Sequence, residues 1–431
     1  MKPVSHINTY TYTLALLLLF TTSSPVSAQE QMDASTGNDS IELSWTDSVK
    51  LKLQQIAGEA DSSYYTTGIY VFDLTSDSLV FAYNQQKQLH PASTQKLFTA
   101  IAALDKLGAR HCYTTSVYAK GSISTDTLGQ NVLNGNIYIV GDFDPKLDAS
   151  SIEEMASSIK NLGISRIEGM LVADLSMKDT VMLGNGWCWD DKQPMLTPLS
   201  MGGDAYLCTK DRINKYNPAA EFLFALRHKL GDNGISVQGC GIGDYQASDS
   251  CTLVCCIKHS IDDVLPRMMK ESDNLYAESM FYQLAADTKK HVGWKDCKTV
   301  VEDVAAAAGA TVSDIRIVDG CGLSFYNYTT VAAEVSMLRY AYKKGGSVFS
   351  PLYESLPVAG IDGTLKNRMK TGKTLSNIHA KTGSLTGVSS LAGYLTAANG
   401  HTLAFSIISN SLKKAAEGRA LQDRICRILC E

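Results

Sequence analysis

Three short segments, in a fixed order, supply the residue types of a serine-based acyl-transfer enzyme. Ser93-Thr94-Gln95-Lys96 places a hydroxyl and an amine one helical turn apart, Ser272-Asp273-Asn274 adds a hydroxyl and an amide, and Lys381-Thr382-Gly383 adds a cation. A serine hydroxyl is a weak nucleophile unless a neighbouring base takes its proton. A lysine can be that base when burial or a second cation holds its amine neutral. Together the segments predict acyl transfer through a covalent acyl-enzyme.

No single segment is specific, because the chain repeats two of them. The repeats are Ser157/Lys160, Ser411/Lys414 and Lys370-Thr371-Gly372. Apolar residues at helical spacing follow Ser93, so Ser93 and Lys96 share one face of a predicted helix. Ser93 also lies near the N-terminus of that helix, where the amide dipoles favour a developing negative charge. The repeated copies lack this setting, since polar or cationic stretches surround two of them and the third lies in a long middle segment.

Ser272-Asp273-Asn274 lies between two apolar stretches with helical spacing, so it is predicted to be a short turn that projects side chains into a cleft. Ser272 can pass a proton to the departing amine, and Asn274 can hold a substrate amide. The alternative is that Ser272 and Asn274 only cap the following helix.

Lys381-Thr382-Gly383-Ser384 leads through Gly387 into an apolar strand over 388–397, which predicts that Lys381 lies at a sheet edge. Gly383 lets a substrate approach the backbone closely. The cation of Lys381 and the hydroxyls of Thr382 and Ser384 suit the free carboxylate of a peptide that lies alongside as an added strand.

The backbone amides of Ser93 and Ser384 are predicted to form the oxyanion hole. Each such donor is typically worth ~3 kcal/mol to the transition state.

The two ends of the chain carry the signals of one shared sheet. These signals are a helix over 45–60, a hairpin of 68–74 and 78–83, a second hairpin of 389–397 and 401–408 around Asn399-Gly400, and an amphipathic helix over 412–429. Residues 108–250 read as one or two inserted β-rich domains. The prediction is therefore a discontinuous catalytic domain, 29–107 and 251–431, with 108–250 inserted after the first segment.

The composition argues against nucleic-acid binding, and the N-terminal residues indicate export. The 431 residues are 45% hydrophobic and 19% charged, which is an ordinary globular balance, and a net charge of −5 gives nucleic acid no reason to bind. Residues 1–28 read as a signal peptide, with Lys2, an apolar run over 14–20 and the small residues Val26-Ser27-Ala28. The alternative, a membrane anchor, fails because this run cannot span ~30 Å of hydrocarbon. The chain is expected to be exported and periplasmic, soluble or loosely membrane-associated.

The eleven cysteines are an odd number, so at least one thiol stays unpaired within a monomer. They are interpreted as buried free thiols, with a disulfide framework as the alternative. The eight histidines show no metal-ligand spacing, so neither a metal nor a cofactor is expected.

With these motifs the chain resembles the penicillin-binding proteins of the penicilloyl-serine transferase group, and more narrowly the low-molecular-mass class C D-alanyl-D-alanine carboxypeptidase/endopeptidase family. The matching stretches are 91–96, 271–278, 381–388 and 391–394. The resemblance implies an α+β fold with a β-lactamase/transpeptidase-like core, an antiparallel sheet flanked by helices, and inserted β-rich domains. It implies hydrolysis of peptidoglycan stem peptides with Ser93 as nucleophile and Lys96 as base, and β-lactams as inhibitors. A homodimer is left open.

Further stretches resemble family elements less completely. They are Gly141-Asp142-Phe143-Asp144-Pro145, 186–191 and Asp319-Gly320-Cys321-Gly322-Leu323-Ser324. The resemblance implies that Asp191 binds the side-chain amine of a diaminopimelate residue, whereas the alternative is a surface or turn aspartate. Many relatives follow the third element with an arginine that holds the stem peptide, and this chain has Phe325 instead.

Two other functions share some of these residues. A serine β-lactamase of class A needs a deacylating glutamate with an asparagine a few residues later, and Glu302 and Glu334 lack that partner. A catalytically idle peptidoglycan-binding or scaffold protein has no use for a base beside a serine. The intact set of Ser93, Lys96, Ser272, Asn274 and Lys381 therefore favours an enzyme.

Overall fold

The computed structural model describes residues 44–61, 63–188, 191–202, 206–207, 217–248, 250–286 and 290–431. The predicted signal peptide, residues 1–28, lies outside the described residues. Within the described ranges, no helix combines the length and the apolar character needed to cross a membrane.

A five-stranded antiparallel sheet joins the two ends of the chain. Strand β1 pairs with strand β12 from Thr66 opposite Asn410 to Asp73 opposite Leu403, as the two predicted hairpins require. The sheet order is β10 (His379–Leu385), β11 (Val388–Thr396), β12 (Thr402–Asn410), β1 (Thr66–Asp73) and β2 (Ser78–Tyr83). The segment with Lys381 forms a strand of its own at the sheet edge, and a turn with Gly387 at φ 76° joins it to β11.

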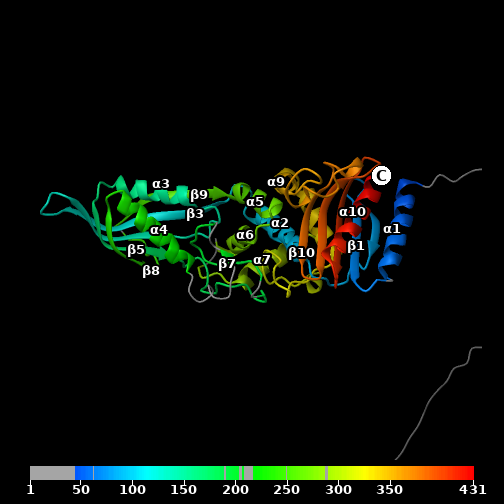
Figure 1. Ribbon diagram of the computed structural model, residues 1–431, viewed down its shortest axis with the longest axis horizontal. Helices are drawn as coiled ribbons and strands as arrows, with labels where there is room; N and C mark the ends of the chain where they lie inside the picture. The colour runs from blue at the N-terminus through cyan, green and yellow to red at the C-terminus, as the bar shows by residue number, and fades with distance from the viewer. Residues whose placement is uncertain are drawn as a thin grey trace, which may run out of the picture. The chain divides into compact units, whose positions relative to one another are not determined.

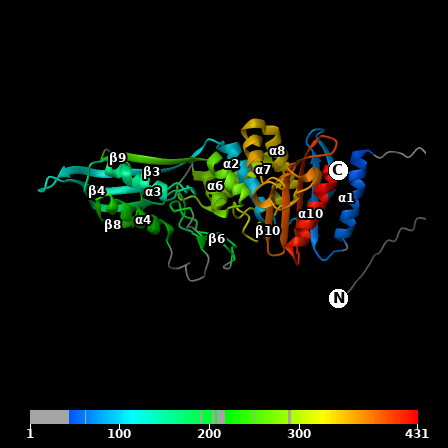
Figure 2. The same ribbon diagram turned by 45° about the horizontal axis from the view of Figure 1, so that its top comes forward.

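Helices cover both faces of this sheet, because its strands alternate two sets of apolar side chains. On one face Leu53 and Ile425 pack with Ile407, and on the other Phe98 packs with Tyr394. The helices of the first face are α1 (Trp45–Asp61) and α10 (Ala415–Cys430), and those of the second side include α2 (Gln95–Lys106) and α8 (Val331–Lys344) (Figure 2). The fold is thus a β-lactamase/transpeptidase-like core, as predicted.

A group of helices behind the second face positions the middle segment of the site. These helices are α5 (Ile261–Lys270), α6 (Asn274–Ala286), α7 (Trp294–Ala307) and α9 (Phe349–Ser355). Helix α5 begins at a capping box in which Ser260 and Asp263 satisfy each other's amides. Buried Leu275 and Phe281 hold α6 in the core shared with α2, so the turn between α5 and α6 is fixed.

The inserted segment contains a mixed five-stranded sheet in the order β8 (Ser236–Ile242), β5 (Arg166–Asp174), β4 (Asn131–Val140), β3 (Cys112–Thr125) and β9 (Cys251–Ser260). Helices α3 (Ala149–Lys160) and α4 (Pro218–Asp232), which the sequence analysis did not predict, share one apolar core with this sheet (Figure 1). Strands β6 (Gln193–Pro194) and β7 (Tyr206–Leu207) pair as a separate two-stranded antiparallel sheet. Strand β9 lies beyond residue 250, and the domain boundaries themselves stay a prediction.

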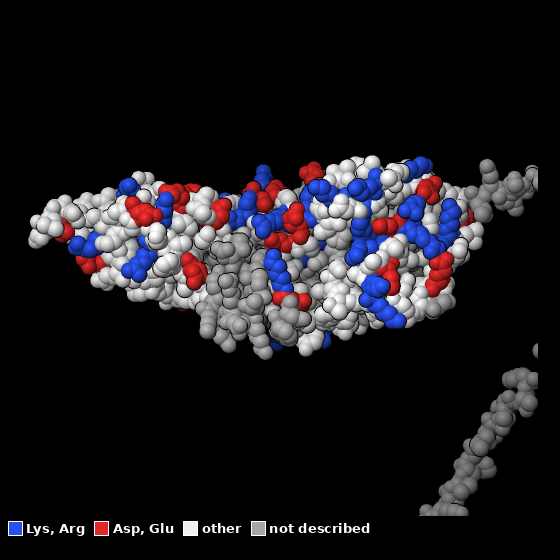
Figure 3. Space-filling view, viewed as in Figure 1, with Lys and Arg blue, Asp and Glu red and all other residues white. Residues whose placement is uncertain are grey.

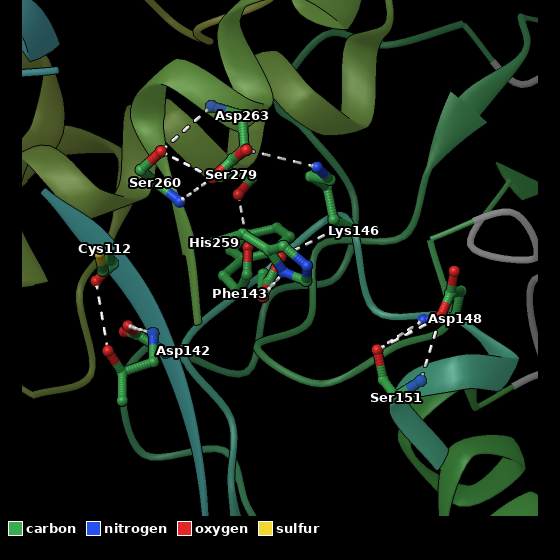
Figure 4. A network of polar contacts seen from close by, with 12 residues as sticks. Cys112, Asp142, Phe143, Lys146, Asp148, Ser151, His259, Ser260, Asp263 and Ser279 are labelled. Carbon is green, nitrogen blue, oxygen red and sulfur yellow. Dashed lines mark hydrogen bonds and ion pairs between the residues drawn. The ribbon is translucent and has the colours of Figure 1, made fainter. Parts of the chain in front are cut away.

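The insertion is tied to helix α6 by polar contacts of the 141–145 turn (Figure 4). The Ser279 hydroxyl donates to the carbonyl of Phe143, and the His259 ring contacts Asp144, with 2.7 Å between Nδ1 and Oδ2. The side-chain amide of Gln283 donates to a carbonyl of the same turn at 2.6 Å. Helix α6, which begins at Asn274, is therefore also hydrogen-bonded to the insertion.

Charged side chains of both signs are interspersed over the half of the molecule that holds the antiparallel sheet, on the face shown in Figure 3. The end of the insertion formed by β3 and β4 shows few of them on this face. This mixed distribution accompanies the small net charge of −5.

Replacing Leu391 by alanine tests the central sheet. Leu391 is fully buried on β11, so Leu391→Ala is expected to lower the free energy of unfolding by about 2–5 kcal/mol. Urea unfolding followed by circular dichroism measures this. Leu79→Ala on β2, where the side chain is 49% exposed, is the matched control and should change it by less than about 0.5 kcal/mol. Equal effects at the two positions would contradict the assigned sheet faces.

Candidate active site

Ser93 lies in a single 3-10 turn, η1 (Ala92–Thr94), at the start of α2. Its side chain is partly exposed while Ala92 and Thr94 are buried, so the hydroxyl can meet a substrate. Ala92 has φ 50°, a left-handed conformation that costs a non-glycine residue roughly 1–3 kcal/mol. The turn is packed so closely that a Cβ at Gly322 would lie 1.9 Å from the carbonyl oxygen of Ala92. Gly322 is therefore required where the backbone passes the nucleophile.

Lys96 lies next to Ser93, with its amine fully buried. Its Nζ donates to Ser93 Oγ at 3.1 Å, to Asn274 Oδ1 at 2.7 Å and to the carbonyl oxygen of Cys321 at 2.8 Å. Burial lowers the pKa of Lys96, although the neighbouring Cys321 and Asp319 act in the opposite direction. A lysine in this position can release its proton far more easily than an exposed one.

Lys381 is the second buried lysine of the site. Its Nζ donates to Ser272 Oγ at 2.9 Å and to the carbonyl of Thr382 at 2.8 Å. Burial, and then the nearby charge of Lys96, hold the pKa of Lys381 well below its usual range. Ser272 has φ 58°, so the α5–α6 turn is strained at the residue that meets this amine.

Strand β10 lies directly against the nucleophile turn. A Cβ at Gly383 would lie 2.8 Å from the amide nitrogen of Ser93 and 2.8 Å from the carbonyl oxygen of Pro91. The residue after Gly383 is Ser384, whose side chain is exposed, and the Thr382 hydroxyl donates to the hydroxyl of Thr364 at 2.7 Å. The structure thus brings all three predicted segments together.

A cleft of about 480 Å³ lies at the α5–α6 turn. It is lined by Lys192, Arg267, Glu271, Ser272, Asp273 and Asn274. Lys192 comes from the insertion, and Asp191 precedes it in a turn where the Asp191 amide donates to the carbonyl of Cys188 at 3.1 Å. The insertion therefore reaches the same cleft as Ser272 and Asn274.

Sequence reasoning missed the backbone carbonyl of Cys321 and the carboxylates that hold its turn. Asp319 accepts hydrogen bonds from Trp187 Nε1 at 2.8 Å and from Asn327 Nδ2 at 2.7 Å, and the amides of Gly322 and Ser324 complete the set. Glu278 accepts the amides of residues 320 and 321 at 2.8 Å each. Burial, and then the charge of Asp319, raise the pKa of Glu278 to about 8. The family-like stretches 186–191 and 319–324 were the available signal.

Phe325 stands where many relatives are expected to have an arginine. Its ring packs edge-on against His90 at 5.6 Å between centroids, and Tyr328 packs on the same imidazole at 4.4 Å. Aromatic packing therefore occupies this place, and a different group must bind a side-chain carboxylate of the substrate if one is bound.

Glu334 is buried directly behind the nucleophile turn. Thr94 Oγ1 donates to one of its carboxyl oxygens at 2.5 Å, and Ser406 Oγ donates to the other at 2.7 Å. Burial raises the pKa of Glu334 to about 7. Both oxygens are thus used within the protein, which agrees with the prediction that Glu334 is not a deacylating base.

The repeated motifs lie away from this arrangement. Ser157 and Lys160 are on α3 of the insertion, and the side chains of 370–372 are exposed before the short helix η6 (Gly372–Thr374). The ten described cysteines are free thiols, as the sequence analysis interpreted them, but the expectation that they are buried is wrong for six of the ten. Four of them are buried: Cys297, Cys321, Cys426 and Cys430.

A serine and two buried lysines at the edge of an antiparallel sheet flanked by helices define a serine hydrolase of the β-lactamase/transpeptidase-like class. The chain belongs to the D-Ala-D-Ala carboxypeptidase 3 (S13) family, whose model matches residues 49–201 and 203–431. It is thus a penicillin-binding protein of the serine carboxypeptidase kind.

Named relatives support this membership. A D-alanyl-D-alanine carboxypeptidase from an Actinomadura species is 28% identical over 85% of this chain and 81% of its own length. The D-alanyl-D-alanine carboxypeptidase DacB of Haemophilus influenzae is 26% identical, covering 78% of this chain and 84% of its own. The crystal structure of penicillin binding protein 4 from Haemophilus influenzae has the same fold, with a TM-score of 0.74, 24% identity, and coverage of 88% of this chain and 97% of that chain.

Glu334→Gln is expected to weaken the pH dependence of stability. Because the folded pKa of Glu334 is raised to about 7, its contribution is fully present below the unfolded pKa near 4.5 and is lost as pH rises toward 7. Across this window the group alone lowers the free energy of unfolding by about 1 kcal/mol per pH unit, and Gln removes that slope. Urea unfolding between pH 4.5 and 7.5 measures it. Glu221→Gln, on the exposed face of α4, is the control; a slope that persists in Glu334→Gln would refute the assignment.

Proposed function

We propose that this chain is a serine-type D-Ala-D-Ala carboxypeptidase/endopeptidase that acts on peptidoglycan stem peptides through an acyl-enzyme on Ser93. The contact of 3.1 Å between Lys96 Nζ and Ser93 Oγ carries the proposal, because it joins a partly exposed hydroxyl to a buried amine with a lowered pKa. The named activity of the relatives, D-alanyl-D-alanine carboxypeptidase, supplies the substrate class.

The acylation step follows from this contact. The neutral amine of Lys96 takes the Ser93 proton while Oγ attacks the carbonyl carbon of the penultimate D-alanine. The amides of Ser93 and Ser384 stabilise the oxyanion. The C–N bond then breaks, and the proton that Lys96 took passes through Ser272, whose hydroxyl contacts Lys381, to the nitrogen of the departing terminal D-alanine. This transfer returns Lys96 to its neutral form.

In the second step neutral Lys96 takes a proton from a water molecule, whose oxygen attacks the ester carbonyl carbon. The bond from that carbon to Oγ breaks, Lys96 returns the proton to Oγ, and the shortened peptide leaves with a free carboxylate.

Substrate binding is assigned to the edge strand and the cleft. The terminal carboxylate is held by Lys381, Thr382 and Ser384, and Asn274 holds the amide of the peptide. Asp191, next to the cleft residue Lys192, binds the side-chain amine of a diamino acid. These roles are consistent with the position of β10 as an edge strand, which leaves one side of its backbone available to a peptide.

β-Lactams are the expected inhibitors, because they acylate the same serine. A structure of the Haemophilus influenzae penicillin binding protein 4 is described as complexed with a β-lactam, with a TM-score of 0.70 and 23% identity to this chain. We further propose export to the periplasm through the signal peptide 1–28, where peptidoglycan is the partner. A homodimer stays open.

Ser93→Ala is expected to abolish both labelling by a fluorescent penicillin and release of D-alanine from a peptide ending in D-Ala-D-Ala. The reason is that no other hydroxyl is hydrogen-bonded to Lys96 among the described residues. Gel fluorescence and a D-alanine assay measure the two losses. Ser157→Ala and Ser411→Ala, which change the repeated motifs, serve as controls and should keep both activities. Labelling that survives in Ser93→Ala would overturn the proposal, and fast turnover of nitrocefin would favour a β-lactamase.

The rate of penicillin acylation is expected to rise with pH and to level off below pH 10.5. The direction follows because Lys96 acts as a base only when neutral, and burial lowers its pKa from the usual 10.5. Lys96→Arg keeps the positive charge at every pH and should slow acylation by roughly 10²- to 10⁴-fold. Stopped-flow acylation between pH 6 and 10.5 measures both. Lys160→Arg in the repeated motif is the matched control, and a rate independent of pH would argue against Lys96 as the base.

A further inference from the structure

A backbone carbonyl accepts a hydrogen bond from the amine of Lys96, in addition to the partners Ser93 and Asn274. This carbonyl belongs to Cys321 and lies 2.8 Å from Nζ. A main-chain oxygen can point at the amine only if the peptide plane around it is fixed. The turn 319–322 that carries it has no regular secondary structure, so side chains must fix it.

The peptide plane of this carbonyl also contains the amide of Gly322, which donates to Asp319 Oδ1 at 2.7 Å. Glu278 fixes the two preceding peptide planes from helix α6. Its side chain is fully buried, and the same oxygen, Oε1, accepts the amides of Gly320 and Cys321 at 2.8 Å each. A single acceptor thus binds two successive N–H groups, and the carbonyl of Cys321 then faces Lys96. Only the backbone of Cys321 separates Glu278 from the amine, because its amide binds Glu278 and its carbonyl binds Lys96.

Asp319 holds the same turn from the other side. Four N–H groups donate hydrogen bonds to the Asp319 side chain, and in each of them a carboxyl oxygen is the acceptor. One donor is the indole of Trp187 from the insertion. The neighbouring Glu278 is fully buried and its pKa is raised to about 8, so its carboxyl group is largely protonated at neutral pH.

Other titratable groups also face Glu278. They are Asp319 and Cys321 on the turn, Lys96 on α2, Lys178 after β5, Cys297 on α7 and Tyr282 on α6 itself. The ligand atoms of Glu278, Asp319 and Cys321 lie within 4.8 Å of one another, which is close enough for a metal ion. The amide and indole donors already occupy the two carboxyl groups, so a structural role fits these residues better than metal binding.

We propose that Glu278 is a positioning residue for Lys96, and that it acts by fixing the backbone directly before the carbonyl of Cys321, so that this carbonyl points at the lysine amine. This inference rests on the proposed function, since it assigns a support to the base of that reaction. For this role the side chain at position 278 must place an acceptor oxygen where Oε1 lies, and it does not have to be charged. Glutamine meets both requirements, and methionine, which has a similar volume, meets only the second.

The test compares Glu278→Gln with Glu278→Met. Acylation by a fluorescent penicillin is followed against pH, and kcat and KM are measured for D-alanine release. Met is expected to lower the acylation rate and kcat by roughly 10- to 100-fold with little change in KM, because a misplaced base slows the chemical step. Gln is expected to stay within about 3-fold of the wild type at pH 7. The rising limb of its pH profile should move to lower pH, because glutamine cannot acquire the negative charge by which Glu278 raises the pKa of Lys96 at alkaline pH.

Two comparisons make the outcome decisive. Leu53→Ala, which removes a fully buried side chain of α1 on the first face of the sheet, is the control for lost stability and should leave the pH profile unchanged. Equal acylation rates in Glu278→Gln and Glu278→Met would overturn the inference. A pH profile of Glu278→Gln that does not shift would also overturn it, and this profile alone decides if Glu278→Met does not fold. A wild-type protein that penicillin fails to label would refute the proposed function instead, so the two failures are distinguishable.

Discussion

The site depends on the burial of two lysine amines close to each other. Removing an ammonium group from water costs several kcal/mol unless a counter-charge or a change of protonation compensates. Among the described residues, the hydrogen-bond partners of Lys96 and Lys381 are hydroxyls, an amide oxygen and backbone carbonyls, and no carboxylate pairs with either amine. These partners satisfy N–H groups without stabilising a charge strongly. The arrangement therefore favours the loss of a proton, which is what a base beside Ser93 requires.

The fold supplies this environment by bringing three segments together at close range. The ends of the chain pair as β1 and β12, which places β10 at the edge of the same sheet. Gly383 and Gly322 then allow backbone to pass within van der Waals range of the nucleophile turn. Ala92 and Ser272 adopt strained left-handed conformations that surrounding packing must stabilise. Strain and small residues are thus concentrated where the two lysines approach their hydroxyl partners.

The sequence predicted the elements that have local signals. Hairpin turns, helix periodicity and the order of the three segments identified the core and the residues that meet in it. The position of Lys381 at a sheet edge was predicted, but the bounds of strand β10 were not, because His379–Leu385 lacks apolar alternation. The carbonyl of Cys321 could not be predicted either, since a backbone group has no residue type and its position depends on tertiary contacts with α6. The role of Asp191 and the domain boundaries stay predictions.

Helix α6 explains how the insertion and the catalytic chemistry are coupled. Its first residue, Asn274, accepts a hydrogen bond from Lys96. One turn later Glu278 accepts the amide of Cys321, whose carbonyl contacts the same lysine amine. The next residue, Ser279, donates to the 141–145 turn of the insertion at Phe143. Adjacent side chains of one helix, Glu278 and Ser279, thus bind the turn that contacts the base and the insertion. Because Trp187 also reaches the turn through Asp319, the insertion contacts the support of Lys96 at two separate places, and a displacement of the insertion must alter the packing around the base.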